Sequence, residues 1–143
     1  MSCVYGKYTH PYSSQLLPFP PYPHLIIHAH THIIHTGCPY EGSIDTNRVV
    51  DVTKELLRLG CYEVSLGDTI GIATPAQVHD LLTLLRARGI PLSRIAVHFH
   101  DTGDKALANI LVSLQHGIGV VDASVSGLGG CPYAEVCSDF LCG

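Results

Sequence analysis

The chain has little charge and no long apolar run, and these two deficits exclude several classes of protein. Charged residues make up 14% of its 143 positions, and the eight lysines and arginines are scattered along it. Nucleic acids and anionic membranes attract clusters of positive charge, so we expect neither as a partner. No apolar run reaches the roughly 18 to 20 residues that a helix needs to cross a bilayer.

We expect neither a secretory signal nor an arginine-rich import sequence at the start of this sequence. Residues 1–15 contain one lysine and no arginine, unlike a mitochondrial transit peptide. The six cysteines lie in unlike settings. We therefore expect reduced thiols in an intracellular enzyme, and not the disulfide framework of a small secreted protein.

Hydrophobic residues are plentiful, at 46% of the chain, and the mean hydropathy is +0.26. This composition predicts one globular domain with well-buried strands. The residues before position 25 are rich in proline and tyrosine and predict an irregular leader. We expect the leader over residues 1–24, the domain over 25–135, and an unrelated tail over 136–143.

From residue 25 onward, apolar strand patterns alternate with helical ones. Strands are predicted over 25–36, 61–66, 94–98 and 119–126, with one helix between each pair. Such alternation is typical of right-handed βαβ units and a parallel sheet. The fold class is therefore α/β, with helices flanking parallel strands.

The helices carry clear start and stop signals. Asp45 is a predicted N-cap for a helix over 46–59, and Thr74-Pro75-Ala76-Gln77 predicts a capping box with proline at the first helical position. Gly60, Gly89 and Gly117 follow the three helices as expected C-terminal stops. The predicted buried stripes are Val49, Val52, Leu56 and Leu59; Val78, Leu81, Leu82 and Leu85; and Leu107, Ile110, Leu111 and Leu114.

Reactive side chains follow three of the predicted strands. Asp68, the pair His98 and His100, and Cys131 each come after a different strand, and parallel strands bring such positions to one edge. Side chains alternate along a strand, so the two histidines share a face. Two imidazoles there can hold a metal ion, and a nearby thiol can exchange a proton. Each residue also has a structural explanation: a packed histidine pair, a buried cysteine, or an aspartate that caps a turn.

Five phrases in order closely resemble the 3-hydroxy-3-methylglutaryl-CoA lyases, a metal-dependent family of the TIM-barrel lyase and synthase superfamily. They are Gly-Cys-Pro-Tyr-Glu-Gly at 37–42, Gly-Cys-Tyr-Glu-Val-Ser-Leu-Gly-Asp-Thr-Ile-Gly at 60–71, Ala-Val-His-Phe-His-Asp-Thr at 96–102, Ala-Leu-Ala-Asn at 106–109 and Gly-Leu-Gly-Gly-Cys-Pro-Tyr-Ala at 127–134. The resemblance implies a partial TIM (β/α)8 barrel, about its last four β/α units.

The resemblance also implies a reaction and a set of roles. The reaction is cleavage of 3-hydroxy-3-methylglutaryl-CoA to acetyl-CoA and acetoacetate, as in leucine degradation and ketone body formation. His98 and His100 match ligands of Mg²⁺ or Mn²⁺, with His98 also a candidate for proton transfer. Cys131 matches the catalytic cysteine of a glycine loop. The residues that match substrate contacts are Asp68, Ser65 and Thr69. The compartment implied is the mitochondrial matrix, with the cytoplasm as the alternative.

The chain departs from the family pattern in ways that predict impaired activity. The first four barrel strands have no counterpart, and with them go an Asp metal ligand and an Arg. Phe140 stands where the family places an Asn ligand, and Gly103-Asp104-Lys105 replaces a usual Tyr-Gly-Gln. Mg²⁺ prefers six oxygen ligands, so its affinity should fall. A truncated or mis-assembled gene product is one explanation.

Two other functions remain open. One is a condensing acyltransferase of the isopropylmalate or homocitrate synthase type, although those enzymes lack the loop that holds Cys131. The other is a non-catalytic fragment that associates with a full subunit or with itself as a homo-oligomer, since an open half-barrel exposes strand edges. A separate group, His28, His30, His32 and His35, is expected to be an accidental histidine-rich strand.

Overall fold

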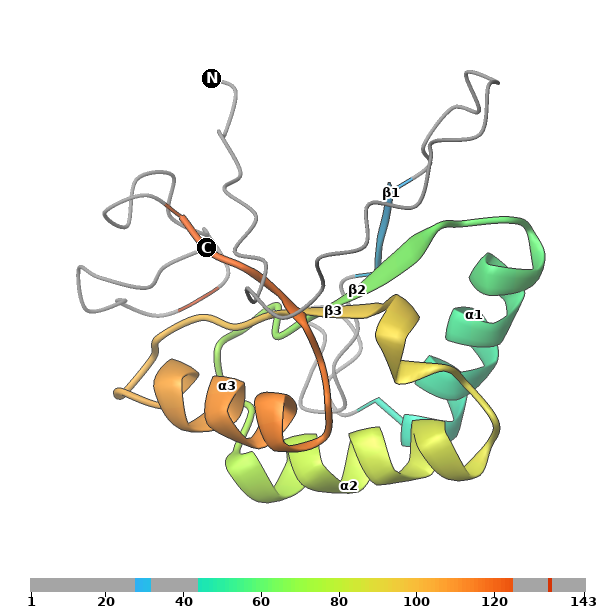
Figure 1. The fold of residues 1–143 in the computed structure, drawn as a ribbon. Helices are drawn as coiled ribbons and strands as arrows, with labels where there is room; N and C mark the ends of the chain where they lie inside the picture. The colour runs from blue at the N-terminus through green and yellow to red at the C-terminus, as the bar shows by residue number, and fades with distance from the viewer. Residues whose placement is uncertain (1–27, 32–43, 125–133, 135–143) are drawn as a thin grey trace, which may run out of the picture.

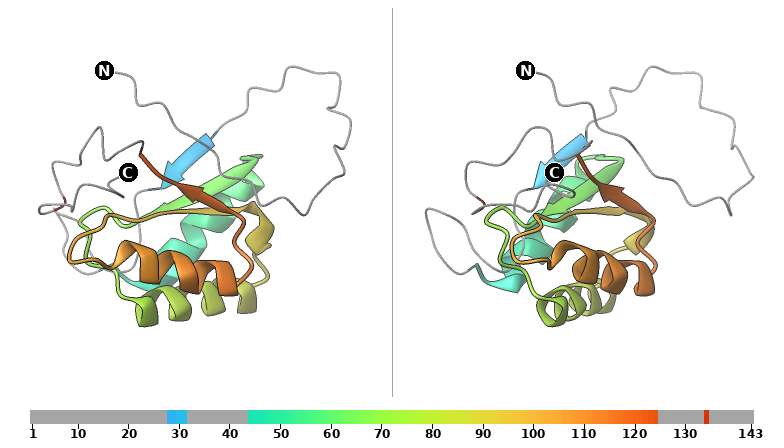
Figure 2. Two further views of the ribbon diagram at one scale, coloured as in Figure 1. Left: turned by 60° about the vertical axis from the view of Figure 1, so that its left-hand side comes forward. Right: turned by 90° about the vertical axis from the view of Figure 1, so that its left-hand side faces the viewer.

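The computed structural model describes residues 28–31, 44–124 and 134, and within them the chain folds as two layers. Four strands form one sheet, and three helices pack on one side of it (Figure 1; Figure 2). The elements in chain order are β1 His28–Thr31, α1 Thr46–Arg58, β2 Glu63–Gly67, α2 Pro75–Ala87, a short 3₁₀ turn η1 Leu92–Arg94, β3 Ile95–His98, α3 Ala106–Gln115 and β4 Val120–Asp122.

All neighbouring strands are parallel, in the order β1-β2-β3-β4. In the register, Gly67 pairs with His98, and His98 pairs with Asp122. These three positions therefore lie in one row at the carboxyl end of the sheet. The predicted βαβ order and parallel sheet are confirmed.

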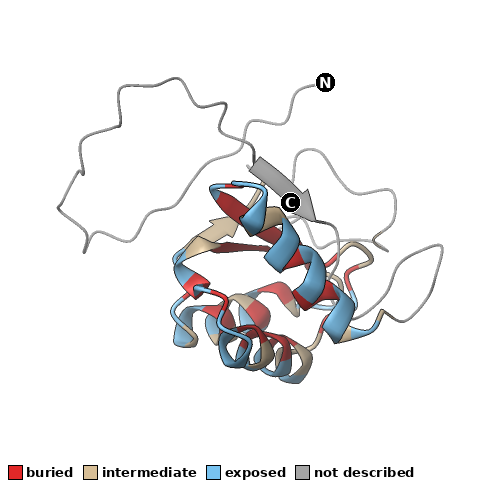
Figure 3. Ribbon diagram, turned by 90° about the vertical axis from the view of Figure 1, so that its right-hand side faces the viewer, coloured by how far each residue is buried: buried red, intermediate tan, exposed pale blue. Residues whose placement is uncertain are grey.

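The core lies between the sheet and the helices, where buried residues concentrate (Figure 3). One set of alternating strand residues points into it, including Val64, Leu66, Ile95 and Val97. Ser65 and Ala96 are buried but lie outside this apolar cluster. The strands thus present their other face away from the helices, and that face carries polar side chains.

The predicted helix signals are confirmed in detail. The Asp45 carboxylate accepts the N–H of Asn47, and Thr74 and Gln77 form both halves of a capping box. All three helices end in the same motif: the N–H three residues past the last helical residue donates back to a carbonyl in the last turn, as Cys61 does to Leu56 at 3.1 Å. The intervening glycines have φ of +95°, +78° and +88°, which only glycine adopts at little cost.

Two of the predicted buried stripes are wrong in part. The stripe of α2 is buried throughout, but α1 buries Val49, Val50 and Thr53, while Val52 and Leu59 are exposed. On α3 the three leucines of the predicted stripe face outward, with Leu107 64% and Leu111 58% exposed, while Ile110 packs against the core as predicted. The residues that α3 buries instead are Ala106, Asn109 and Ser113. They also repeat at helical spacing, and their small size and hydrogen bonds, not their hydrophobicity, suit this contact.

None of the helices in the described ranges has the length and apolar character needed to span a membrane. The proposed leader (1–24), the glycine loop with Cys131, Phe140 and the tail (136–143) lie outside the described residues. Of the predicted strand over 25–36, the structure describes β1, and the remaining positions lie outside it as well.

Candidate active site

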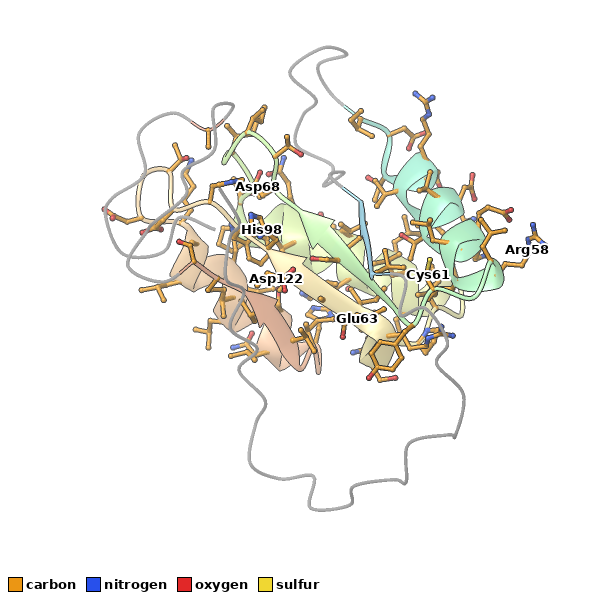
Figure 4. The ribbon with its side chains drawn as sticks, turned by 90° about the horizontal axis from the view of Figure 1, so that it is seen from above. Arg58, Cys61, Glu63, Asp68, His98 and Asp122 are labelled. Atoms are coloured by element: carbon orange, nitrogen blue, oxygen red, sulfur yellow. The ribbon has the colours of Figure 1, made fainter. Side chains whose placement is uncertain are left out.

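The candidate site lies where β2, β3 and β4 end. Seen from above, Asp68, His98 and Asp122 gather toward the same end of the sheet, while Cys61 and Glu63 lie at the opposite end (Figure 4). Each of the three comes from a different strand or the loop directly after it. The parallel sheet therefore brings together residues that the sequence separates by more than fifty positions.

His98 and His100 lie side by side at this edge. Their ring centroids are 5.0 Å apart and their planes meet at 77°. Phe99 between them is buried in the helix-facing core, so the chain keeps its alternation past the end of β3. His98 is half-buried, whereas His100 is 3% exposed. The structure thus brings both predicted imidazoles together on one face.

The hydrogen bond of His100 selects one tautomer of its neutral ring. Its Nδ1 contacts the backbone carbonyl oxygen of Asp68. A carbonyl can only accept, so Nδ1 carries a proton, and in the neutral ring Nε2 then has the lone pair. Nε2 is buried and has no hydrogen-bond partner among the described residues. A buried lone pair without a partner is costly, and metal-binding histidines show this same arrangement of a fixed Nδ1–H and an available Nε2.

Asp68 is fully engaged with the backbone around it. Its two carboxylate oxygens accept the N–H groups of Ile72 at 3.2 Å and Ala73 at 3.1 Å, and its side chain is 1% exposed. Its own N–H donates to the carbonyl of His98 at 2.8 Å. Asp68 therefore fixes the loop over 68–73, as a turn-capping aspartate does. Its predicted contact with substrate stays a prediction.

The same loop approaches the histidine segment too closely for a side chain at its turn. Gly71 has φ +69°, and a Cβ built there would overlap the hydroxyl of Thr102 and lie 3.2 Å from Cβ of His100. Glycine at this position thus lets the loop pack directly against the side chains of Thr102 and His100. Thr69, the other predicted contact in the loop, is half-buried.

Ser65 has a partner that sequence reasoning missed. Its hydroxyl donates to Oδ2 of Asp122 on β4 at 2.6 Å, across β3. Asp122 is half-buried and is the register partner of His98. The sequence does offer one indication of a functional residue here, because Asp122 is an acidic residue in an otherwise apolar strand. Only the strand order shows that it meets Ser65.

The turn after the histidines is built by residues that depart from the family pattern. Gly103 and Asp104 have φ of +65° and +57°. Lys105, the residue directly before α3, makes no side-chain capping bond. The carboxylate of Asp101 caps the start of the helix instead, by accepting the N–H of Ala106 at 3.0 Å. The turn is closed despite the changed residues.

The described residues supply two imidazoles and no larger ligand cluster. Among positions 28–31, 44–124 and 134, no group of three or more His, Cys, Asp or Glu is arranged to hold a metal ion. Cys131 lies outside these ranges, so its predicted approach to the histidines stays a prediction. The backbone of β1 pairs His28 with Glu63 and His30 with Ser65.

The sequence matches a family model described as HMGL-like over residues 25–132. The mitochondrial hydroxymethylglutaryl-CoA lyase of Gallus gallus is 56% identical over 99 residues, which are 69% of this chain and 33% of that protein. The cytoplasmic 3-hydroxy-3-methylglutaryl-CoA lyase of Homo sapiens is 58% identical over 99 residues, 69% of this chain and 26% of that protein.

The fold matches solved lyases as well. A structure of an HMG-CoA lyase from Acinetobacter baumannii, in complex with coenzyme A and 3-methylmalate, superposes with a TM-score of 0.64 at 36% identity, covering 75% of this chain and 35% of that one. This chain therefore spans about a third of the length of the first curated relatives it matches. The parallel sheet with flanking helices corresponds to part of the barrel of these lyases, so the expected partial barrel is confirmed.

Proposed function

Because the chain belongs to the HMGL-like family, we propose that its sheet edge forms part of a hydroxymethylglutaryl-CoA lyase site. The substrate would be 3-hydroxy-3-methylglutaryl-CoA, split into acetyl-CoA and acetoacetate. The observation that carries the proposal is the imidazole pair, in which His100 has a fixed tautomer and a buried Nε2 lone pair.

A divalent cation, Mg²⁺ or Mn²⁺, would bind at His98 and His100. When bound, it supplies a Lewis acid for the substrate oxygens. The donors fit a cation, since the Nε2 of His100 otherwise stays unsatisfied. Imidazole nitrogen suits Zn²⁺ or Ni²⁺ better than Mg²⁺, which prefers oxygen ligands. We therefore expect this chain to bind Zn²⁺ and Ni²⁺ more tightly than Mg²⁺.

Cleavage of the carbon–carbon bond needs two proton transfers. One group takes the proton of the tertiary hydroxyl, and another protonates the carbon released on the acetyl-CoA side. We assign the first transfer to His98, which ends β3 and is more exposed than His100. The second we assign to Cys131, from its match to the family's glycine loop.

The substrate contacts are proposed on the residues that follow β2. The Ser65 hydroxyl donates its proton to Asp122 at the end of the sheet, and we place a hydroxyl group of the substrate beside it. Asp68 and Thr69 would contact the substrate from the loop over 68–73. In this arrangement the carboxylate of Asp68 would contact the substrate and also hold the loop over 68–73 in place.

The proposal is tested by cation binding and by turnover. Calorimetric titration of the metal-free protein with Zn²⁺, Ni²⁺, Mn²⁺ and Mg²⁺ should show one site that His100→Ala weakens at least about tenfold. Asp51→Asn, on the exposed face of α1, is the matched control. Incubation with 3-hydroxy-3-methylglutaryl-CoA and Mn²⁺ should release little acetoacetate, and His98→Ala or Cys131→Ala should remove what there is.

Two results would overturn the assignment. Zn²⁺ binding that His100→Ala leaves unchanged would remove the cation site from this edge. Condensation of acetyl-CoA with a 2-oxo acid and release of CoA, without cleavage of 3-hydroxy-3-methylglutaryl-CoA, would move the chain to the synthase reaction. The relatives include mitochondrial and cytoplasmic lyases, and we propose the mitochondrial matrix for this chain.

Association with another subunit is a second candidate function. The outward face of α3 exposes Leu107, Leu111 and Leu114. Burying this apolar stripe against another subunit would be favourable, because it removes apolar surface from water. Light scattering after size exclusion should then show a homo-oligomer that Leu107→Gln with Leu111→Gln dissociates. A monomer in both cases would rule out self-association through this face.

A further inference from the structure

Asn109 is a fully buried polar residue that the proposed reaction does not use. It lies in the middle of α3, is fully buried, and points its side-chain amide toward the loop over 68–73. Its Nδ2 donates to the carbonyl of Ala73 at 3.0 Å, while its Oδ1 has no partner among the described residues. Burying an amide oxygen without a hydrogen-bond partner is unfavourable, so we expect the other end of this amide to make a specific and important contact.

That contact begins a continuous series of hydrogen bonds. Ala73, held by Asn109 through its carbonyl, donates its N–H to Oδ2 of Asp68. The carbonyl of Asp68 then accepts Nδ1 of His100. All four residues are at most 3% exposed, so water does not compete for these bonds. The series runs from α3 to the imidazole without a gap.

The loop has little freedom to compensate for a lost link. Gly71 already lies against Thr102 and Cβ of His100, at a spacing that admits no side chain. Asp68 also accepts the N–H of Gly71 at 3.2 Å, so its carbonyl serves both the turn and the imidazole. A shift of Ala73 must therefore be transmitted to the carbonyl that sets the tautomer of His100.

We propose that Asn109 is a positioning residue for His100: its amide fixes the 68–73 loop so that the Asp68 carbonyl keeps Nδ1 protonated and Nε2 available as a ligand. The ligand role of Nε2 rests on the function proposed above, whereas the tautomer does not. Asn109 touches neither substrate nor cation in this account. It acts through two other residues.

The direct test is the tautomer of His100 in the metal-free protein. Long-range ¹H–¹⁵N correlation spectra, with His100→Gln to assign the signal, should show Nδ1 protonated in the wild type. Free imidazole prefers the other tautomer, so the bond to Asp68 is needed to hold this one. Asn109→Leu keeps the branched shape but removes the donor, and it should give a mixture of tautomers.

Ser113→Ala provides the matched control. Ser113 is fully buried on the same face of α3, and its hydroxyl bonds only the carbonyl of Asn109 within the helix in the contacts described. We expect Ser113→Ala to leave the tautomer unchanged and the Zn²⁺ affinity within twofold of wild type. Asn109→Leu should lower the Zn²⁺ affinity about tenfold, which is the smaller end of the loss found when a residue that supports a metal ligand is replaced.

The outcomes separate this inference from the proposed function. Nε2 protonated in the wild type would overturn the inference even if Asn109→Leu failed to fold. An unchanged tautomer in Asn109→Leu would overturn it too, as would an equal change in Ser113→Ala. A wild type that binds no Zn²⁺, but whose tautomer shifts in Asn109→Leu, would refute the cation site and support the positioning role.

Discussion

Replacing the carboxylate of Asp68 should destabilise the fold, not merely affect a reaction. Asp68→Asn keeps one acceptor oxygen and turns the other into an amide donor that faces a backbone N–H. One of two bonds to Ile72 and Ala73 is lost, and a buried donor is left without an acceptor. Hydrogen bonds to charged groups contribute about 1.5–3 kcal/mol each. We expect the free energy of unfolding to fall by about 2–3 kcal/mol, and by about 3–5 kcal/mol in Asp68→Ala.

The assay is urea unfolding followed by far-UV circular dichroism, with Asp51→Asn as an exposed control on α1. A loss of about 2 kcal/mol corresponds to a drop in Tm of roughly 7–9 °C in a domain of this size. Amide hydrogen exchange at Ile72 and Ala73 should accelerate first, because those N–H groups lose their acceptor. Asp68→Asn with a free energy of unfolding within about 0.5 kcal/mol of wild type would refute the structural role. The carboxylate would then serve substrate alone.

Four further substitutions test the helix layer. Leu111→Gln should alter the free energy of unfolding by less than about 0.5 kcal/mol, because the side chain is exposed. Ala106→Leu should lower the free energy of unfolding by about 1–3 kcal/mol, because the larger side chain overpacks a buried position. If urea unfolding shows Leu111→Gln to be the more destabilising, the leucine face of α3 is the buried one, as the sequence predicts. Thr74→Ala should cost about 1 kcal/mol through loss of the capping box, measured as a lower urea midpoint, and no change would show that the cap is redundant. The pKa of His116 lies below its ordinary value because of burial and then of positive charge on His79, so its contribution to stability is full above about pH 6.5 and is lost as pH falls. His116→Asn should therefore flatten the decline in the free energy of unfolding between about pH 8 and pH 5, and an equally steep decline would contradict the assignment.

Local signals in the sequence were enough to place the secondary structure. The caps at Asp45 and Thr74 and the glycines after each helix are confirmed because such motifs depend on residues within a few positions of one another. The alternation of strands and helices likewise determined a parallel sheet, since few connections of that length have another solution. The edge at which Asp68, His98 and His100 gather follows directly from this topology.

The tertiary structure alone decided which side of each helix is buried and which side chains meet. On α3 two sets of residues share helical spacing, and packing selected the small, polar one with Asn109 over the leucines. Ser65 finds Asp122 only because β2 and β4 flank β3. The tautomer of His100 depends on a carbonyl thirty-two positions away. Contacts between distant parts of the chain are set by how the layers fit together, and hydrophobic periodicity carries no information about that fit.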